Sequence, residues 1–209
     1  MDRKAIFDQI KGGLIVSCQA LEHEPLYTKE GGIMPLMAKA AAQSGAVGIR
    51  ANTVRDITQI KEAVDLPVIG IIKKDYEGTP MYITVTMKEV DELVACGVDI
   101  LAVQGTSALR PDGSTAAQFI EAIKAKYPEQ LVMADCATIE EGIACANAGA
   151  DLSARPCADI HRRHRAVMTS ILISSMSFPK NARQRSSQRD ISTIRSRQRR
   201  HWRQGLLRW

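Results

Sequence analysis

The sequence predicts an α/β fold built on parallel strands, and two observations carry this prediction. Hydrophobic residues make up 45% of the 209 residues but aromatic residues only 4%, which is typical of aliphatic strands covered by helices. Short aliphatic runs also alternate with amphipathic stretches at regular spacing. Repeated strand–helix units imply parallel strands joined by right-handed crossovers, either in a barrel or in a doubly wound sheet.

Five strand–helix units and the start of a sixth can be drawn along the chain. A leading helix is expected at residues 5–10, where apolar side chains recur at helical spacing. Later helices with the same recurrence are expected at residues 35–44, 56–64, 87–96, 116–126 and 139–147. Strands are expected as aliphatic runs at residues 14–18, 46–49, 67–72, 100–103 and 131–134, with 150–152 opening the sixth. Periodicity alone does not distinguish a barrel from an open sheet.

Polar side chains recur where the predicted strands end. They are Gln19, Arg50, Lys73, Gln104 and Asp135. Ligands bind at the carboxyl ends of the strands in barrels and in doubly wound sheets alike. We therefore expect one shared site at this edge of the sheet.

The cysteines indicate neither a disulfide framework nor a zinc site. There are five, an odd number, and none forms a Cys-x-x-Cys pair. The first residues carry charges, and no apolar run approaches the roughly 20 residues of a membrane span. We therefore expect a cytoplasmic protein with no membrane partner.

The net charge of +5 is the average of two dissimilar parts. Residues 1–152 hold 14 of the 28 Lys and Arg and 21 of the 23 Asp and Glu, a net of −7, and the remainder carries +12. Lysine outnumbers arginine 10 to 4 in the first part, whereas the second has one lysine and 13 arginines. Such a change of residue usage is not a gradual surface effect.

No strand–helix unit can be drawn from residue 153 onward. Arginine clusters at 161–165 and 195–200 are of the kind that binds nucleic-acid phosphates. An Arg/Ser-rich stretch that begins abruptly inside a repeat is also what out-of-frame translation gives, and we favour this interpretation. We therefore divide the chain into an incomplete barrel domain at 1–152 and a frameshifted or disordered tail at 153–209.

Six segments in order make the first 150 or so residues resemble the N-acetylmannosamine-6-phosphate 2-epimerase family. They are residues 13–19 (GLIVSCQ), 48–51 (GIRA), 70–76 (GIIKKDY), 82–84 (YIT), 110–113 (RPDG) and 135–138 (DCAT). The resemblance implies a (β/α)8 barrel of the TIM type, here ending after five to six units. It also implies inversion at carbon 2 of N-acetylmannosamine 6-phosphate, a step of sialic acid and amino-sugar catabolism, without metal or other cofactor.

The resemblance assigns Lys73 as the catalytic base that moves the carbon-2 proton. A lysine that follows Ile71 and Ile72 at a strand end has its charged form disfavoured by desolvation, which favours a neutral amine. The resemblance also implies that Arg50 holds the substrate and stabilises developing oxyanion charge. Gln19 and Asp135 are implied to bind sugar hydroxyls, although capping of a strand end or of the next helix are alternatives.

The sequence departs from the family pattern in two ways. Related sequences usually carry aspartate at Gln104, where an amide cannot supply the same charge, and a proline or another residue at Val85. The family's Gly-Thr-Thr, Ala-Glu-Gly and Gly-Gly-Ala-Ile-Thr-Arg-Pro segments are not found in this sequence. The last of these binds phosphate in the family, in line with the phosphate sites after strands 7 and 8 of such barrels. We therefore expect weak activity or none.

Two other functions are weighed against the epimerase. One is a degenerate barrel with a basic tail that binds nucleic acid, which is less favoured. The other is a barrel enzyme acting on a different phosphosugar, since fold alone does not fix function. The expected partner is a phosphorylated amino sugar, and a homo-oligomer is compatible with the sequence.

Overall fold

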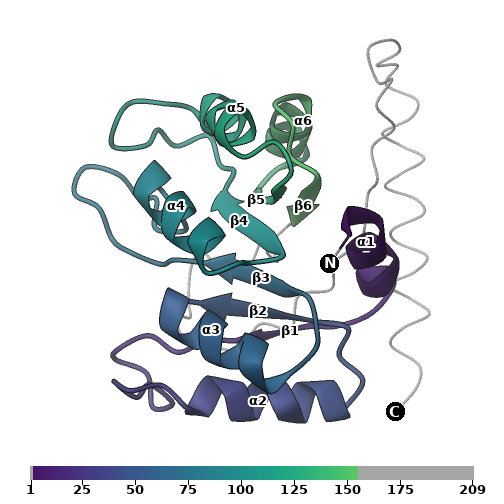
Figure 1. Ribbon diagram of the computed structural model, residues 1–209. Coiled ribbons are helices and arrows are strands. Elements are labelled where there is room, and N and C mark those ends of the chain that lie inside the picture. Colours follow the sequence, from purple (N-terminus) through teal and green to yellow (C-terminus); the bar gives the residue numbers. More distant parts are fainter. Residues whose placement is uncertain (1, 155–209) are drawn as a thin grey trace, which may run out of the picture. The chain divides into compact units, whose positions relative to one another are not determined.

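Six parallel strands form one curled sheet in the computed structural model, which describes residues 2–154 (Figure 1). The tail assigned to 153–209 lies outside the described residues except for Ser153 and Ala154. The strands are β1 (Ile15–Cys18), β2 (Gly48–Asn52), β3 (Val68–Ile71), β4 (Ile100–Gln104), β5 (Leu131–Asp135) and β6 (Leu152–Ala154). The last strand therefore runs past the predicted boundary at residue 152.

The strand order decides between the two architectures that periodicity allows. The sheet runs β1-β2-β3-β4-β5-β6 with every neighbouring pair parallel. A doubly wound sheet reverses its strand order at a switch point, whereas a barrel adds each strand on the same side of the last. The described residues thus form a half-barrel of the TIM type, and the predicted fold class is confirmed.

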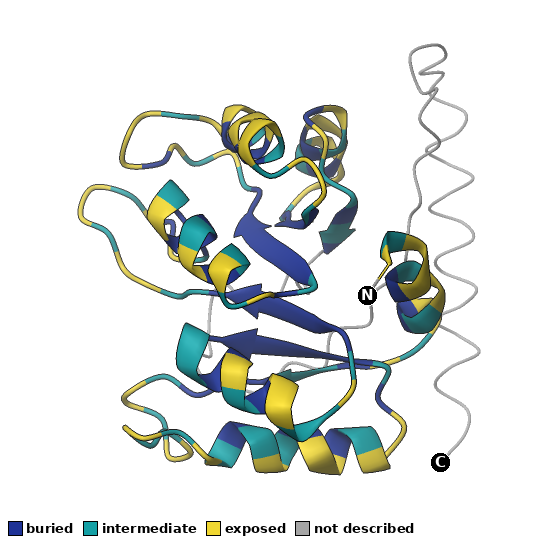
Figure 2. Cartoon of the chain, in the orientation of Figure 1, coloured by how far each residue is buried: buried dark blue, intermediate teal, exposed yellow. Residues whose placement is uncertain are grey.

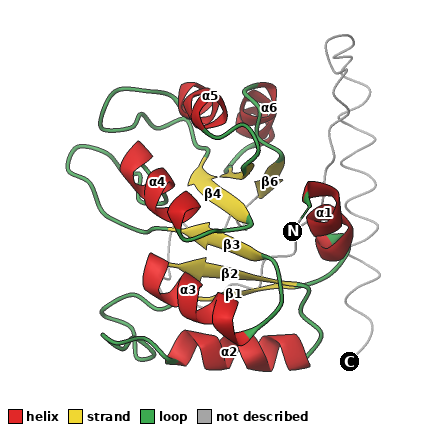
Figure 3. Ribbon diagram, viewed as in Figure 1, coloured by secondary structure: helices red, strands yellow, loops and turns green. Residues whose placement is uncertain are grey.

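The helices alternate with the strands as predicted (Figure 3). They are α1 (Arg3–Ile10), α2 (Ile33–Gln43), α3 (Val54–Ala63), α4 (Met87–Ala95), α5 (Ala116–Lys126) and α6 (Ile139–Asn147). A threonine precedes each of the last four, and the hydroxyls of Thr115 and Thr138 accept from the backbone N–H three residues on. These caps explain why α5 and α6 begin at the predicted residues.

The second predicted strand is displaced, as is the sixth, which was expected to open at residue 150 and begins at Leu152. The run 46–49 was expected as the second strand, but β2 spans Gly48–Asn52 and includes Arg50 and Asn52, which are 5% and 2% exposed. The prediction stopped at the first charged residue because a buried parallel strand is normally aliphatic. The strand continues because its polar side chains have partners inside the barrel, as described below.

The strands bury both of their faces, and the two faces have different neighbours. Outward side chains such as Ile49, Leu101 and Val132 pack in one cluster with the helices. Gly70 belongs to this layer, and a Cβ there would lie 2.3 Å from Val98 Cγ1. Figure 2 shows β2, β3, β4 and β5 buried along their length and the helices exposed on their outer sides. The central four strands therefore have no solvent-facing side, whereas β1 and β6 are partly exposed.

Inward side chains form a second, smaller cluster. It contains Ile15, Ile69, Ile71, Ile100, Ala102, Leu131, Met133, Leu152 and Ala154 from the strands. Ile6 and Ile10 of α1 belong to the same cluster, and Arg3 of that helix pairs with Asp151 just before β6. The helix α1 therefore closes the interior at the end where the strands begin. Among the described residues no helix is both long and apolar enough to cross a membrane.

Candidate active site

The polar strand-end residues continue the inward rows of the barrel. Side chains alternate between the two faces of a strand, so residues two apart share a face. Inward-facing Ile71 and Met133 are followed two residues later by Lys73 and Asp135. The same spacing leads from Ala102 to Gln104, and two such steps lead from Ile15 through Ser17 to Gln19. The interior thus changes from apolar to polar at the carboxyl ends of the strands, where the sequence predicts a site.

Arg50 and Asp135 meet across the interior although their strands are not neighbours. Arg50 Nη1 donates to Asp135 Oδ1 at 2.9 Å, and Nη2 donates to Oδ2 at 2.6 Å. The two side chains are only 6% and 8% exposed. Burial acts to lower the pKa of Arg50, but the Asp135 carboxylate outweighs it, so that pKa lies above its ordinary value. The pair is a bidentate, charge-assisted contact that keeps a cation in the interior.

The geometry removes one alternative for Asp135. The sequence allows two interpretations of its carboxylate: a ligand for sugar hydroxyls, or a cap for the following helix. The cap of α6 is Thr138, and Glu141 accepts from the N–H groups of Ala137 and Thr138. Asp135 is therefore free of capping and engages Arg50 instead.

Lys73 lies close to this pair and is partly buried. Burial is the largest cause that lowers its pKa below the ordinary value, and the charge of Arg50 lowers it further. The carboxylates of Glu24 and Asp135 oppose this shift without cancelling it. The shift has the direction expected from desolvation, and it enlarges the neutral amine fraction that can accept a proton.

The backbone around Lys73 is held from both sides. Asn52 Oδ1 accepts from the N–H of Lys73 at 2.9 Å. Lys73 also forms an isolated antiparallel bridge with Ile83, and the N–H of Lys74 donates to the carbonyl of Tyr82 at 2.9 Å. The chain after β3 therefore folds back on itself and fixes where the lysine side chain begins. Lys74 itself is exposed, with its ammonium 5.2 Å from the Tyr76 ring centroid.

Gln104 is part of the same support. Its Oε1 accepts from the N–H groups of Tyr82 at 3.0 Å and Ile83 at 3.4 Å, and its backbone N–H donates to the Ile83 carbonyl. Nε2 donates to Thr106 Oγ1 at 3.2 Å. The Gln104 amide thus ties β4 to the returning segment. Val85 is also buried, and its N–H donates to Glu89 Oε2.

Gln19 completes the polar end of the interior. Its Nε2 donates to Ser17 Oγ at 2.5 Å, and its Oε1 is buried without a hydrogen-bond partner in the described part of the chain. Because the Ser17 hydroxyl can donate or accept, either orientation of the amide leaves one polar atom unsatisfied. That atom is suited to bind a ligand hydroxyl.

Sequence reasoning missed two residues of this site. Asn52 follows Arg50 by two positions on the same strand, so the two-residue period could have identified it. Glu24 is in the loop after β1, and its influence on Lys73 leaves no local sequence signal. Tyr76, to which no role was assigned, donates its hydroxyl to Glu89 and so joins the loop to α4.

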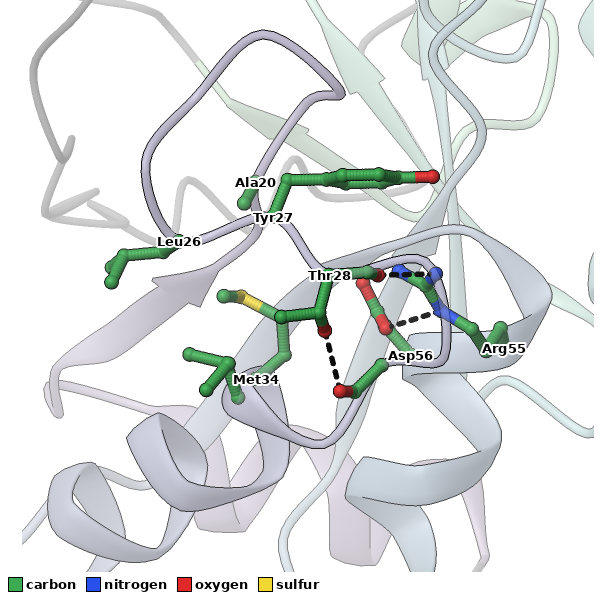
Figure 4. A pocket seen from close by; sticks show the side chains of 9 residues that line it. Ala20, Leu26, Tyr27, Thr28, Met34, Arg55 and Asp56 are labelled. Carbon is green, nitrogen blue, oxygen red and sulfur yellow. Dashed lines mark hydrogen bonds and ion pairs between the residues drawn. The ribbon is translucent and has the colours of Figure 1, made fainter.

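A hollow beside this site has no predicted residue in its lining. Figure 4 shows it between the loop after β1 and the starts of α2 and α3, lined by Tyr27, Met34 and Arg55 among others. Arg55 is already satisfied there, because it donates to the Thr28 carbonyl at 2.7 Å and to Asp56 Oδ1 at 2.9 Å. The hollow thus offers little polar chemistry. No cluster of three or more His, Cys, Asp or Glu suited to a metal occurs among residues 2–154.

Comparison with known proteins agrees with this geometry. The NanE family model, described as "Putative N-acetylmannosamine-6-phosphate epimerase", matches residues 34–155, which is more than half of the chain. The chain belongs to this family. The matched range includes Arg50, Lys73 and Asp135, and it ends just after β6.

Individual family members give the same result over a limited length. A protein of Caldanaerobacter subterraneus named "Putative N-acetylmannosamine-6-phosphate 2-epimerase" is 54% identical over 147 residues, 70% of this chain and 61% of that protein. One of the same name from an Enterobacter species is 54% identical over 138 residues, 66% of this chain and 58% of that protein. The chain therefore spans about three-fifths of the length of these relatives.

A solved structure of the family shares the fold. The N-acetylmannosamine-6-phosphate 2-epimerase from Clostridium perfringens superposes with a TM-score of 0.65 at 48% sequence identity. The match covers 70% of this chain and 62% of that one. Membership of the family and the barrel-type fold of the described residues thus rest on independent comparisons of sequence and structure.

Proposed function

We propose that this chain acts on N-acetylmannosamine 6-phosphate and removes its carbon-2 proton, the step that opens conversion to N-acetylglucosamine 6-phosphate. Family membership supports the substrate class, a phosphorylated amino sugar, and a cytoplasmic setting. The observation that carries the proposal is the position of Lys73, a partly buried amine with a lowered pKa beside the Arg50–Asp135 pair. A base next to a fixed cation is what removal of a proton beside a carbonyl requires.

The proposed reaction begins with the open-chain sugar. The neutral amine of Lys73 accepts the proton from carbon 2, and the electron pair left on carbon delocalises into the neighbouring aldehyde. The resulting enolate oxygen carries negative charge, which the Arg50 guanidinium stabilises while Asp135 holds that guanidinium in place. The unsatisfied atom of Gln19 binds a sugar hydroxyl. Lys73 then holds the proton as an ammonium.

Inversion needs the proton to return on the opposite face of carbon 2. Among residues 2–154 the site sets one proposed base, Lys73, beside the Arg50–Asp135 pair, and a single base returns the proton to the face from which it came. We therefore propose that the described site exchanges the carbon-2 proton faster than it inverts the carbon. Return of a solvent-derived proton from Lys73 restores the starting sugar with exchange and no change of configuration.

The test is to incubate the full chain with N-acetylmannosamine 6-phosphate in heavy water and follow the carbon-2 signal by proton NMR. We expect deuterium to enter carbon 2, with less N-acetylglucosamine 6-phosphate formed than deuterium incorporated. Lys73→Ala should abolish incorporation, whereas the matched control Lys74→Ala should leave it unchanged. Incorporation that survives Lys73→Ala would exclude Lys73 as the base, and absence of incorporation in the parent chain would refute the proposed activity.

A further inference from the structure

A second group of reactive side chains lies on the outer side of the sheet, between its strand ends and the helices. Cys136 follows β5 directly, Cys145 is on α6, and Arg110 is in the loop between β4 and α5. The sulfur atoms of Cys136 and Cys145 are 3.9 Å apart, and the two residues are 2% and 1% exposed. A Cβ at Gly105 would lie 2.9 Å and 3.0 Å from these sulfurs, so the glycine lets them approach the end of β4.

Arg110 is a buried cation with unmet hydrogen-bonding capacity. The residue is 3% exposed, and its guanidinium carbon lies 3.9 Å from the centroid of the Phe119 ring. Nη2 donates to the Gln104 carbonyl at 2.8 Å, but Nε and Nη1 have no partner among the described residues. Burial lowers the pKa of Arg110 to about 10. Because a buried charge is costly unless it is paired, this environment favours an anion beside it.

The nearby carboxylates do not supply that anion by direct contact. Asp112 accepts from the N–H and hydroxyl of Ser114 at the surface. Glu89 accepts from the N–H groups of Val85 and Thr86. Their charges act on Arg110 only through space, as does that of Cys145. Asp112 already accepts hydrogen bonds in a turn, and Glu89 does so at the start of α4. The buried thiol of Cys145 takes part in neither a turn nor a helix cap.

The two thiols are inequivalent. Cys136 donates its S–H to Cys145 Sγ, and this hydrogen bond together with the charge of Arg110 lowers the pKa of Cys145. The same hydrogen bond and burial raise the pKa of Cys136. Burial and Glu141 oppose the shift at Cys145, and the Gly105 carbonyl, 3.6 Å from its sulfur, accepts only from the neutral thiol. The hydrogen bond from Cys136 and the charge of Arg110 therefore both favour the thiolate of Cys145.

We propose that Cys145, Cys136 and Arg110 form a dithiol redox site that a small hydroperoxide oxidises to a disulfide. The Cys145 thiolate attacks one peroxide oxygen, breaks the O–O bond and becomes a sulfenic acid, while the other oxygen leaves as hydroxide and takes up a proton. The Cys136 thiol loses its proton and attacks the Cys145 sulfur, which releases the sulfenic oxygen as a second water. Two thiols and one hydrogen peroxide give one disulfide and two waters.

The site is placed where its oxidation reaches the polar end of the barrel. Bond formation draws the two sulfurs from 3.9 Å to about 2 Å, and Cys136 directly follows Asp135. We therefore expect oxidation to displace the end of β5, where Asp135 holds the Arg50 guanidinium. This link to the reaction rests on the proposed function, whereas the thiol chemistry does not.

The test uses the full-length chain with Cys157→Ser, since Cys157 lies outside the described residues. The protein is treated with hydrogen peroxide, remaining thiols are blocked by alkylation, and the digest is analysed by mass spectrometry. We expect a linked Cys136–Cys145 peptide pair before Cys18 or Cys96 is oxidised. Burial raises the pKa of Cys18 to about 11 and that of Cys96 above its ordinary value, so both serve as internal controls.

Arg110→Met and Arg110→Lys separate the role of charge from that of packing. Arg110→Met should slow disulfide formation about tenfold, because the Cys145 thiolate loses its neighbouring cation, while Arg110→Lys should retain most of the rate. Alkylation of Cys18, which is fully buried, reports whether a variant has unfolded. Equal rates in the parent and in folded Arg110→Met would overturn the proposal. So would oxidation of Cys96 without any linked peptide in the parent, a result that needs no variant.

Discussion

The two ends of the barrel interior have opposite chemistry. Where the strands begin, Ile15, Ile69 and Ile100 pack with Ile6 and Ile10 of α1, and none of these residues is more than 6% exposed. Where the strands end, the same inward rows carry charged and amide side chains that bond to one another. The apolar end stabilises the fold without offering chemistry, and the polar end keeps reactive groups in the interior at a desolvation cost.

The largest loss of stability is expected from a substitution at the polar end. Asp135→Ala leaves the Arg50 guanidinium buried without its partner, so the free energy of unfolding should fall by about 3–5 kcal/mol. Urea denaturation followed by circular dichroism measures this loss. Proton exchange should also vanish in the folded fraction. A loss below about 1 kcal/mol, the scale of an exposed ion pair, would show that the contact is not buried in solution.

The next largest loss of stability is expected from a substitution at the apolar end. Ile100→Ala removes a fully buried side chain and should lower the free energy of unfolding by about 3 kcal/mol. Carbon-2 exchange per folded molecule should stay as in the parent, because the cavity lies two residues or more below the polar layer. Ile100→Val is the graded control, with an expected loss of about 1 kcal/mol. Carbon-2 exchange that falls more in Ile100→Ala than in Ile100→Val would show that the two ends are coupled, which would contradict this account.

A smaller loss of stability is expected from a change that affects the position of the proposed base, Lys73. Asn52→Ala removes the acceptor of the Lys73 N–H and should cost about 1 kcal/mol, with a larger relative loss of exchange. Thr115→Ala, which removes the cap of α5 far from Lys73, should cost a similar amount and leave exchange intact. Denaturation and exchange are measured on both variants. Equal exchange in the two would mean that Asn52 supports the fold and does not position Lys73.

The smallest effect on stability concerns the charge of Lys73. Its pKa in the fold lies below the ordinary value of the unfolded chain, so the unfolded state binds more protons between the two values. Stability should therefore rise with pH through that window, and Lys73→Met should remove this contribution. Carbon-2 exchange should rise with pH as the amine becomes neutral. An exchange rate that falls as pH rises toward the pKa of Lys73 would assign the base to another group.

The sequence predicted the order of the elements and the edge that carries the polar side chains. These features could be predicted because helix caps such as Thr138 and short aliphatic strands depend on residues close together in the sequence. The strand containing Arg50 was placed too early, since its burial depends on Asp135, 85 residues away. Glu24 and the contacts of Gln104 were missed for the same reason. Contacts across the interior are set by curvature of the sheet, which no local pattern encodes.

The contrast between the two ends is tested most directly by replacing the ion pair with apolar residues. The double variant Arg50→Met with Asp135→Leu fills similar volume without buried charge, and such replacements are often neutral or stabilising. We expect the double variant to unfold at the same or a higher urea concentration than the parent and to show no carbon-2 exchange. A double variant that exchanges the proton, or that loses as much stability as Asp135→Ala, would contradict the conclusion that the polar end exists for chemistry.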